Sequence, residues 1–99
     1  MPLFWSQPAI DDLERVYHFL LRVNPQAAAG VVQSLVTASK NLITHPRRGP
    51  ALIEFQPREV RRLICGHYEI RYECQNTTLY ILRVWHTREH RSREADSER

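Results

Sequence analysis

The sequence predicts a small α+β protein, in which an N-terminal β-strand and an antiparallel helical hairpin pack on an antiparallel β-sheet in the order β-α-α-β-β-β. Apolar residues recur at three- and four-residue spacing over most of residues 10–43, which is typical of amphipathic helices. Over residues 60–85 they alternate or form short runs rich in branched and aromatic side chains, which is typical of strands. Because each apolar face needs a partner layer, we expect both helices to cover one face of the sheet.

The first strand and the first helix are predicted from residues 3–21. Leu3-Phe4-Trp5 is a short apolar run that fits a brief strand. Ser6 or Gln7 is the expected N-cap of the helix, and Asp11 and Asp12 complement the positive end of its dipole. The predicted apolar face of this helix consists of Ile10, Leu13, Val16, Tyr17, Leu20 and Leu21.

Asn24-Pro25 marks the junction between the two helices. Asn is a common N-cap, and Pro is favoured at the first position of a helix. The helical period then continues until Pro46 stops it, through Ala28, Val31, Val32, Leu35, Ala38, Leu42 and Ile43. Because only about two or three residues separate the helices, they should form an antiparallel αα-hairpin.

A loop and three strands are predicted after the second helix. Prolines and a glycine interrupt the pattern from Thr44 to Pro57, and Leu52, Ile53 and Phe55 are expected to attach this loop to the core. The strands should span residues 60–65, 67–74 and 78–85, with a turn at residues 75–77.

The two later strands differ in how their side chains are distributed. Residues 67–74 alternate, with Tyr68, Ile70, Tyr72 and Cys74 on one face and His67, Glu69, Arg71 and Glu73 on the other. The last strand has apolar side chains on both faces, with Tyr80, Leu82 and Val84 on one side and Leu79, Ile81 and Trp85 on the other. A strand of this kind is expected at the centre of a sheet, covered on both sides.

The length and the composition describe one globular domain. The chain has 99 residues, of which 42% are hydrophobic and 25% charged, and these values exclude wholesale disorder. Residues 1–91 are predicted to form the domain, and residues 92–99 a charged, mobile tail. Residues 47–93 contain ten arginines against five glutamates, so the basic character lies in the second half of the chain.

Several function classes find no support in the sequence. No apolar run could span a membrane and no signal peptide is visible, so we expect a cytoplasmic protein. Cys65 and Cys74 fall at opposite ends of a predicted hairpin, which is too far for a disulfide, and are expected to be reduced thiols. His67, His86 and His90 lack further ligands at a workable spacing, so no metal and no cofactor are predicted. No glycine-rich phosphate loop or nucleophile elbow is present.

Two basic clusters are the candidate partner-binding surface. The first lies at the end of the last strand, where Arg83, Trp85, His86, Arg88 and Arg91 combine an aromatic side chain with basic groups. An alternative for Arg83 is an ion pair with Glu69 or Glu73 across the sheet.

The second cluster consists of arginines on the predicted sheet. Arg61 and Arg62 are adjacent and must therefore point to opposite faces, and Arg71 is on the next strand. A sheet face that no helix covers and that carries such arginines could receive an acidic protein or a phosphate backbone.

The chain resembles the ParE/RelE family of small toxins from bacterial toxin–antitoxin modules over about residues 3–91. The resemblance rests on the order and spacing of Phe4-Trp5-Ser6, Ala9-x-x-Asp12-Leu13, Asn24-Pro25-x-Ala27-Ala28, Val60-Arg61-x-Leu63, Gly66-x-Tyr68-x-Ile70-x-Tyr72 and Ile81-Leu82-Arg83-Val84-x-His86-x-x-x-His90-Arg91. The fold of that family, a helical hairpin with a short sheet, agrees with the fold predicted from the periodicity.

This family has two functional branches, and the resemblance favours one of them. RelE-like members cleave mRNA on the ribosome with basic residues on the sheet and with an arginine and a tyrosine near the C-terminus. In this chain Glu69 occupies the strand position of a RelE-like arginine, Arg88 matches the later arginine, and no tyrosine follows Tyr80. The ending Arg83-Val84-Trp85-His86 is similar to ParE-like members, which inhibit DNA gyrase by binding and have no catalytic site.

The resemblance therefore implies a gyrase-binding toxin that a cognate antitoxin neutralises, in a hetero-oligomer with that antitoxin. The alternative is a ribosome-dependent endoribonuclease acting on mRNA, for which Arg61, Arg83, His86 and Arg88 are the candidate catalytic residues. A third outcome is a degenerate toxin that is inactive but still binds its antitoxin.

Overall fold

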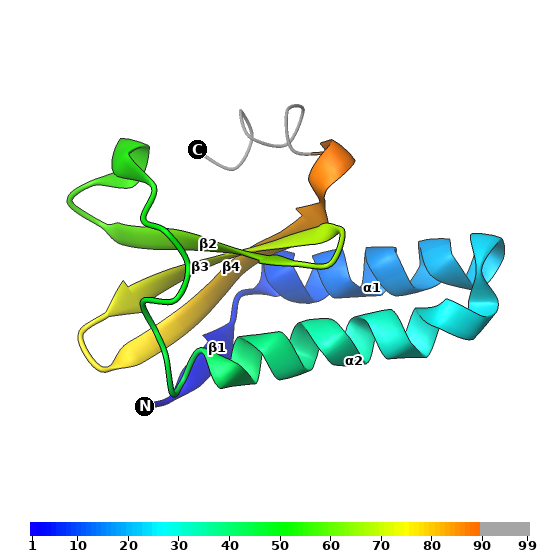
Figure 1. Cartoon of the computed structure of the whole chain (residues 1–99), viewed down its shortest axis with the longest axis horizontal. Helices are drawn as coiled ribbons and strands as arrows, with labels where there is room; N and C mark the ends of the chain where they lie inside the picture. The colour runs from blue at the N-terminus through cyan, green and yellow to red at the C-terminus, as the bar shows by residue number, and fades with distance from the viewer. Residues whose placement is uncertain (90–99) are drawn as a thin grey trace.

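The computed structural model describes residues 1–89 and confirms the predicted order of strands and helices (Figure 1). The elements are β1 (Leu3–Trp5), α1 (Gln7–Val23), α2 (Pro25–Asn41), β2 (Glu59–Cys65), β3 (Tyr68–Gln75) and β4 (Thr78–His86). Two short 3₁₀ helices, η1 (Ile53–Phe55) and η2 (Thr87–Glu89), precede β2 and follow β4. The predicted tail at residues 92–99 and the candidate residue Arg91 lie outside the described residues.

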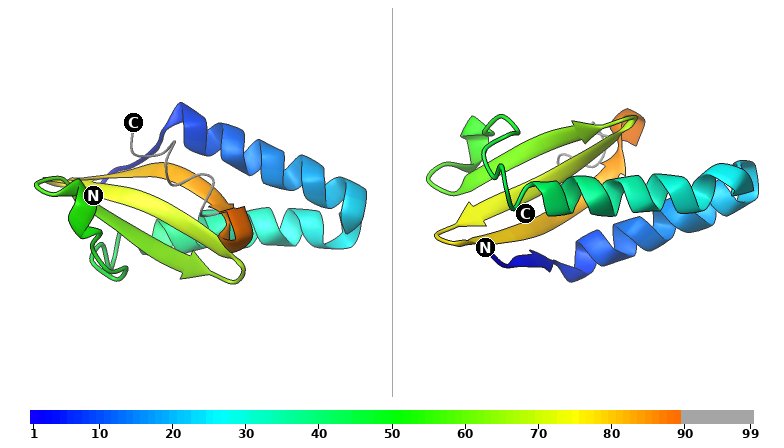
Figure 2. Two further views of the ribbon diagram at one scale, coloured as in Figure 1. Left: turned by 90° about the horizontal axis from the view of Figure 1, so that it is seen from above. Right: turned by 60° about the horizontal axis from the view of Figure 1, so that its bottom comes forward.

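The four strands form one sheet in the order β1-β4-β3-β2. β2, β3 and β4 are antiparallel neighbours, whereas β1 pairs in parallel with β4, with Leu3 opposite Leu79. The central position predicted for β4 is therefore confirmed, and β3 is central as well. Because α1 begins directly after β1, it runs along β4, as Figure 2 shows from two further directions.

The two helices cover one face of the sheet and form the core with it. Leu35 of α2 and Leu42, which directly follows α2, pack with Tyr72 and Ile81 of the sheet, and all four are less than 2% exposed. Only Asn24 separates the helices, and their joined ends project beyond the strands (Figure 1).

Of the two predicted N-caps, the one at the start of α1 is confirmed and the one at the start of α2 is not. The Ser6 hydroxyl accepts a hydrogen bond from the Ala9 N–H at 3.1 Å, which confirms Ser6 as the N-cap. Asn24 makes no side-chain cap for α2; its carbonyl instead accepts from the Ala27 N–H. Asp12 does not serve the helix dipole as predicted, because its side chain turns toward β4.

The predicted apolar face of α1 is only partly buried. Ile10, Tyr17 and Leu21 are 39%, 37% and 41% exposed, although the spacing places them on that face. The reason is that α1 packs against β4, and its buried residues Ala9, Asp12 and Val16 form a narrower strip than the full apolar face of the helix.

A β-bulge in β4 changes which of its side chains enter the core. Arg83 lies opposite Arg71 but Ile81 lies opposite Tyr72, so Leu82 is an extra residue. The bulge reverses the alternation after Leu82. Val84 therefore joins Ile81 in the core, and Trp85 lies on the other face with Arg71, contrary to the prediction from strict alternation.

The loop between α2 and β2 is held against the sheet by polar contacts. The Tyr72 hydroxyl donates to the Pro46 carbonyl at 2.8 Å and accepts from the Gly49 N–H at 3.1 Å. A side chain at residue 49 would place its Cβ 2.2 Å from the carbonyl oxygen of Arg62, so this close approach requires glycine. Ile53 does not attach the loop to the core as predicted, because it is 76% exposed.

The two hairpins of the sheet close with two-residue turns at Gly66-His67 and Asn76-Thr77. Gly66 and Asn76 both have positive φ, which such tight turns require. Cys65 and Cys74 are free thiols at opposite ends of the β2–β3 hairpin, as predicted.

Candidate protein-binding surface

The basic sheet face predicted around Arg71 is closed in the structure. The side chains of Arg71 and Glu69 are both 2% exposed, and their ion pair measures 3.1 Å from Arg71 Nη2 to Glu69 Oε2. The Arg71 guanidinium also lies 5.0 Å from the ring centroid of Trp85 and 5.4 Å from that of Phe55, within cation–π distance of both. Arg71 therefore does not lie on an exposed basic face as predicted, since aromatic side chains and a paired carboxylate enclose its guanidinium. Trp85, predicted to bind a partner, is itself buried.

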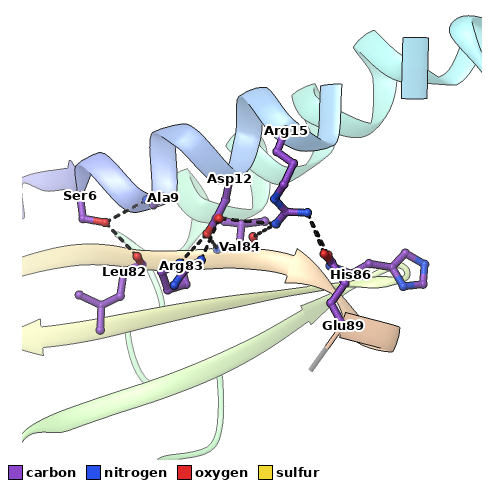
Figure 3. Close-up of polar contacts among 9 residues, drawn as sticks. All are labelled: Ser6, Ala9, Asp12, Arg15, Leu82, Arg83, Val84, His86 and Glu89. Atoms are coloured by element: carbon purple, nitrogen blue, oxygen red, sulfur yellow. Dashed lines mark hydrogen bonds and ion pairs between the residues drawn. The ribbon is translucent and has the colours of Figure 1, made fainter. Parts of the chain in front are cut away.

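Arg83 is fixed by the junction of α1 and β4, which Figure 3 shows. The Asp12 carboxylate accepts from Arg83 Nε at 2.8 Å, from Arg83 Nη2 at 3.1 Å and from the Val84 N–H at 2.8 Å. The Asp12 residue is 3% exposed. A buried carboxylate with these donors is fully satisfied, and it binds both the side chain and the backbone of the strand. The acid that binds Arg83 thus comes from α1, whereas the alternative from the sequence named Glu69 or Glu73.

Ser6 also joins the start of α1 to β4, at the bulged residue Leu82 and its neighbour Ile81. Its hydroxyl donates to the Leu82 carbonyl at 2.9 Å while it caps α1, and its N–H donates to the Ile81 carbonyl at 2.9 Å (Figure 3). The bulged segment of β4 is therefore also hydrogen-bonded to the residue that caps the start of α1.

Arg61 and Arg62 point to opposite faces, as predicted. Arg61 Nη1 donates to the Gly49 carbonyl and Nε to the Glu59 carboxylate, both at 2.8 Å. The hydrogen bond from Arg61 lowers the pKa of Glu59, against the opposing effect of burial. Arg62 lies opposite Arg71 and approaches Glu69 at 3.7 Å.

A groove lies between the second half of α1 and the end of β4. This α1 groove has a volume of about 570 Å³. One wall is formed by α1 through Arg15, Val16, His18, Phe19 and Arg22, and the other by the strand ends and η2 through Tyr68, His86, Arg88 and Glu89. Of the predicted binding residues that lie within residues 1–89, only His86 and Arg88 meet here.

The wall of the groove formed by η2 is held in place by Glu89. Its carboxylate accepts from Arg15 Nη1 at 2.9 Å and from the His86 N–H at 2.9 Å (Figure 3). The His86 Nδ1 accepts from the Arg88 N–H at 3.0 Å, which fits an imidazole that carries its proton on Nε2. These contacts leave the Arg88 side chain exposed beside the groove.

Two aromatic side chains, Tyr68 and His86, contact each other in the wall formed by the strand ends. The ring of Tyr68 meets that of His86 edge to face, with 5.2 Å between the centroids. Burial raises the pKa of Tyr68, and the negative charge of Glu89 raises it further, so the phenol stays neutral at physiological pH.

The α1 wall was not predicted from the sequence. A signal for it was present, because Phe19 is a large apolar residue outside the predicted apolar face of the helix. Arg15 and Arg22 lie four residues before it and three after it, so all three share one helix face. A large apolar residue that lies between two arginines and outside the predicted core face indicates a second contact surface.

The candidate catalytic residues of the ribonuclease alternative are not brought together. Arg61 shares the helix-covered face with Tyr72, whereas Arg83 shares the opposite face with Trp85, and β3 separates their strands. Only His86 and Arg88 are neighbours. Within residues 1–89, no three His, Cys, Asp or Glu side chains gather in a way that could hold a metal ion.

The fold of this chain was compared with those of solved structures. It is similar to a structure described as the chromosomal ParDE TA system from P. aeruginosa, with a TM-score of 0.70 and 26% sequence identity, over 87% of this chain and 95% of that chain. The fold is thus similar to that of a protein from a toxin–antitoxin system. Residues 3–91 match the ParE toxin of the type II toxin-antitoxin system parDE, and the chain belongs to the ParE toxin family. A comparison with curated proteins found no match.

No helix in the described part of the chain is both long and apolar enough to cross a membrane.

Proposed function

We propose that this chain is a toxin that inhibits DNA gyrase by binding it, and that a cognate antitoxin neutralises the toxin. The observation that carries the proposal is the engagement of the sheet arginines. Arg61 and Arg83 are each bound by a carboxylate of the chain itself, on opposite faces of the sheet. An arginine held in this way is not placed to stabilise the negative charge that develops during RNA cleavage.

The surface that stays accessible suits binding to a protein. The α1 groove combines exposed arginines with Phe19, which is 50% exposed, and Val23 at the end of the same helix is 59% exposed. Aromatic side chains and arginines are the residue types enriched in protein interfaces. Exposed apolar side chains on one helix also favour a partner that covers them. An acidic, amphipathic antitoxin segment that orders on binding would supply both the apolar surface and the negative charge.

The proposal is tested by inducing the chain in a bacterial host and measuring two products at once. We expect the host to stop growing and its plasmid DNA to lose negative supercoiling, while the 5′ ends of its mRNAs stay unchanged. Codon-phased mRNA cuts with normal supercoiling would instead establish the ribosome-dependent endoribonuclease. Normal growth on strong induction would establish the inactive toxin.

Purified components separate direct from indirect inhibition. The purified chain should reduce the ATP-dependent supercoiling activity of purified gyrase, with no effect on a type I topoisomerase assayed on the same plasmid. Addition of the protein encoded beside this chain should restore the gyrase activity. Gyrase that is unaffected at a hundredfold molar excess of the chain would contradict the proposal.

A further inference from the structure

The short helix η2 is capped by a histidine side chain. The first backbone N–H groups of a helix have no acceptor within the helix itself. In η2 the Arg88 N–H donates to Nδ1 of the His86 side chain at 3.0 Å. In return, the Glu89 carboxylate accepts from the backbone N–H of His86 at 2.9 Å (Figure 3). These reciprocal contacts are similar to a capping box, in which the capping residue is usually Ser or Thr.

Two N–H groups at the start of η2 differ in whether their acceptors titrate. The Thr87 N–H donates to the backbone carbonyl of His67 at 2.9 Å, and a carbonyl oxygen does not titrate. The Arg88 N–H donates to an imidazole nitrogen, which accepts only while the ring is neutral and carries its proton on Nε2. Protonation of the ring places a second N–H against that of Arg88, so this hydrogen bond is lost.

The side chains around His86 are mostly cationic or neutral. The ring of His67 stacks on that of His86, with 6.0 Å between the centroids and 12° between the planes, so positive charges on the two rings repel each other. The Glu89 carboxylate is negative but is already bound to Arg15 at 2.9 Å. The titratable and charged groups that face His86 are His67 from the turn before β3, Tyr68 from β3, Arg15, His18 and Arg22 from α1, and Arg88 and Glu89 from η2. Cations outnumber the carboxylate in this set, so a charge on His86 gains little in exchange for the lost hydrogen bond.

We infer that His86 is a pH-sensitive cap, whose neutral imidazole orders η2 and whose protonation between about pH 8 and pH 5 releases the Arg88 N–H and loosens η2. Because the neutral ring is the form that accepts, the cap is present at the alkaline end of this range and is lost toward the acid end.

Loosening of η2 changes one wall of the α1 groove. That wall is linked to α1 by the ion pair between Glu89 and Arg15, which lies directly after the cap. The strand β4 is held by its backbone ladder with β3, which does not titrate, so the change is confined to η2. The inference goes beyond the proposed function, because it concerns a property of the chain alone and holds whichever partner the toxin binds.

The test is an NMR titration of the full chain from pH 8 to pH 5. The ¹⁵N resonances of the His86 ring report its tautomer and its protonation. The exchange of the Arg88 amide with water, divided by the rate of an unstructured peptide at the same pH, reports the cap. The Thr87 amide is the internal control, because its acceptor is a backbone carbonyl.

We expect the His86 ring to carry its proton on Nε2 at pH 8. The protection of the Arg88 amide should then fall at least about fivefold by pH 5, which corresponds to one ordinary hydrogen bond, and it should fall in step with protonation of the ring. The protection of the Thr87 amide should change less than about twofold.

Two substitutions of His86 separate the cap from the bulk of the ring. In His86→Asn the side-chain oxygen accepts in place of Nδ1 and does not titrate, so Arg88 should stay protected from pH 8 to pH 5. In His86→Phe the ring remains but accepts nothing, so Arg88 should be unprotected throughout. His67→Asn and His18→Asn are the matched controls, since both leave the cap in place and should keep the fall. Circular dichroism checks that each variant is folded.

Four results would overturn the inference. The ring could carry its proton on Nδ1 at pH 8, or the protection of Arg88 could be the same at pH 8 and pH 5. The fall could persist in His86→Asn, or it could disappear in His67→Asn or His18→Asn, in which case another group drives it. These measurements use neither gyrase nor an antitoxin, so their outcome is independent of the outcome for the proposed function.

Discussion

The arginines of the sheet and those of the α1 groove have opposite roles, although they are the same residue type. In the sheet, Arg61, Arg71 and Arg83 are bound by carboxylates of the chain and are at most one-fifth exposed. In the groove, Arg22 and Arg88 are exposed beside apolar side chains. The first set stabilises the fold, and the second is available to a partner. The number of arginines in a segment therefore overstates its free positive charge by the number of ion pairs that the fold makes.

The largest effect is expected at the junction of α1 and β4, where the buried Asp12 carboxylate binds both the side chain of Arg83 and the backbone of the strand. Asp12→Ala removes the acceptor of Arg83 and of the Val84 N–H, and leaves a partly buried cation without its carboxylate. We expect a loss of about 3–5 kcal/mol in the free energy of unfolding, measured by urea denaturation. Asp11→Ala, one residue away and exposed, is the matched control and should change little.

Asp12→Asn sharpens the same test. The amide oxygen can still accept from the Val84 N–H, but the charge that binds Arg83 is lost, so the variant should fall between the unchanged chain and Asp12→Ala. If Asp12→Ala is as stable as Asp11→Ala, Arg83 is not held by this pair, and its role at the surface must be reconsidered.

A smaller effect is expected at Arg61, which is 17% exposed. Arg61→Met keeps the apolar stem but loses the hydrogen bonds to Gly49 and Glu59. Because these bonds involve charged groups, we expect a loss of about 1.5–3 kcal/mol, again by urea denaturation. Arg48→Met in the neighbouring loop is the control, since Arg48 is exposed. A variant with unchanged stability and reduced toxicity would show that Arg61 serves the target.

The fold was predictable from the sequence because its signals are local. Helical spacing, the Ser6 cap and strand alternation each depend on neighbouring residues, and the sheet and helices follow from them. Two features were not predictable in this way. The bulge at Leu82 reverses the faces of Val84 and Trp85, and the parallel pairing of β1 with β4 joins residues far apart in the chain.

The candidate site was less predictable than the fold, for a physical reason. Whether an arginine is free depends on which carboxylate the fold brings to it, and Asp12 lies 71 residues before Arg83. The sequence shows that the basic residues lie mostly in the second half of the chain. It does not show which of them form ion pairs in the fold. It named His86 and Arg88, which line the groove, but not Arg22 and Phe19, which line the groove from the first half of the chain.

A pH-dependent effect on stability is expected for the ion pair between Arg58 and Glu73. The hydrogen bond from Arg58 lowers the pKa of Glu73 below its usual value of about 4.5, and outweighs the burial that raises it. Because the folded-state pKa is the lower one, the pair stabilises the protein above pH about 4.5, and this contribution is lost as the pH falls through the folded-state pKa.

Arg58→Ala tests that contribution. The Arg58 side chain is 54% exposed, so at pH 7 we expect a loss below about 1 kcal/mol. Urea denaturation between pH 7 and pH 2 should show the difference between variant and unchanged chain shrinking toward zero in acid. A difference that stays constant over this range would mean that Arg58 acts through packing on Phe55 instead of through charge.

The smallest effect is expected in the groove, and it distinguishes the two regions most directly. Phe19 is 50% exposed, and its clearest contact is the guanidinium of Arg22, an interaction worth about 0.5 kcal/mol at exposed positions. Phe19→Ser should therefore change the free energy of unfolding by less than about 0.5 kcal/mol. A loss above about 2 kcal/mol would show that Phe19 is part of the core, and the groove would then belong to the fold as the sheet arginines do. Unchanged stability means that a large aromatic side chain is kept at the surface without benefit to folding, which is expected of a residue whose partner is another protein.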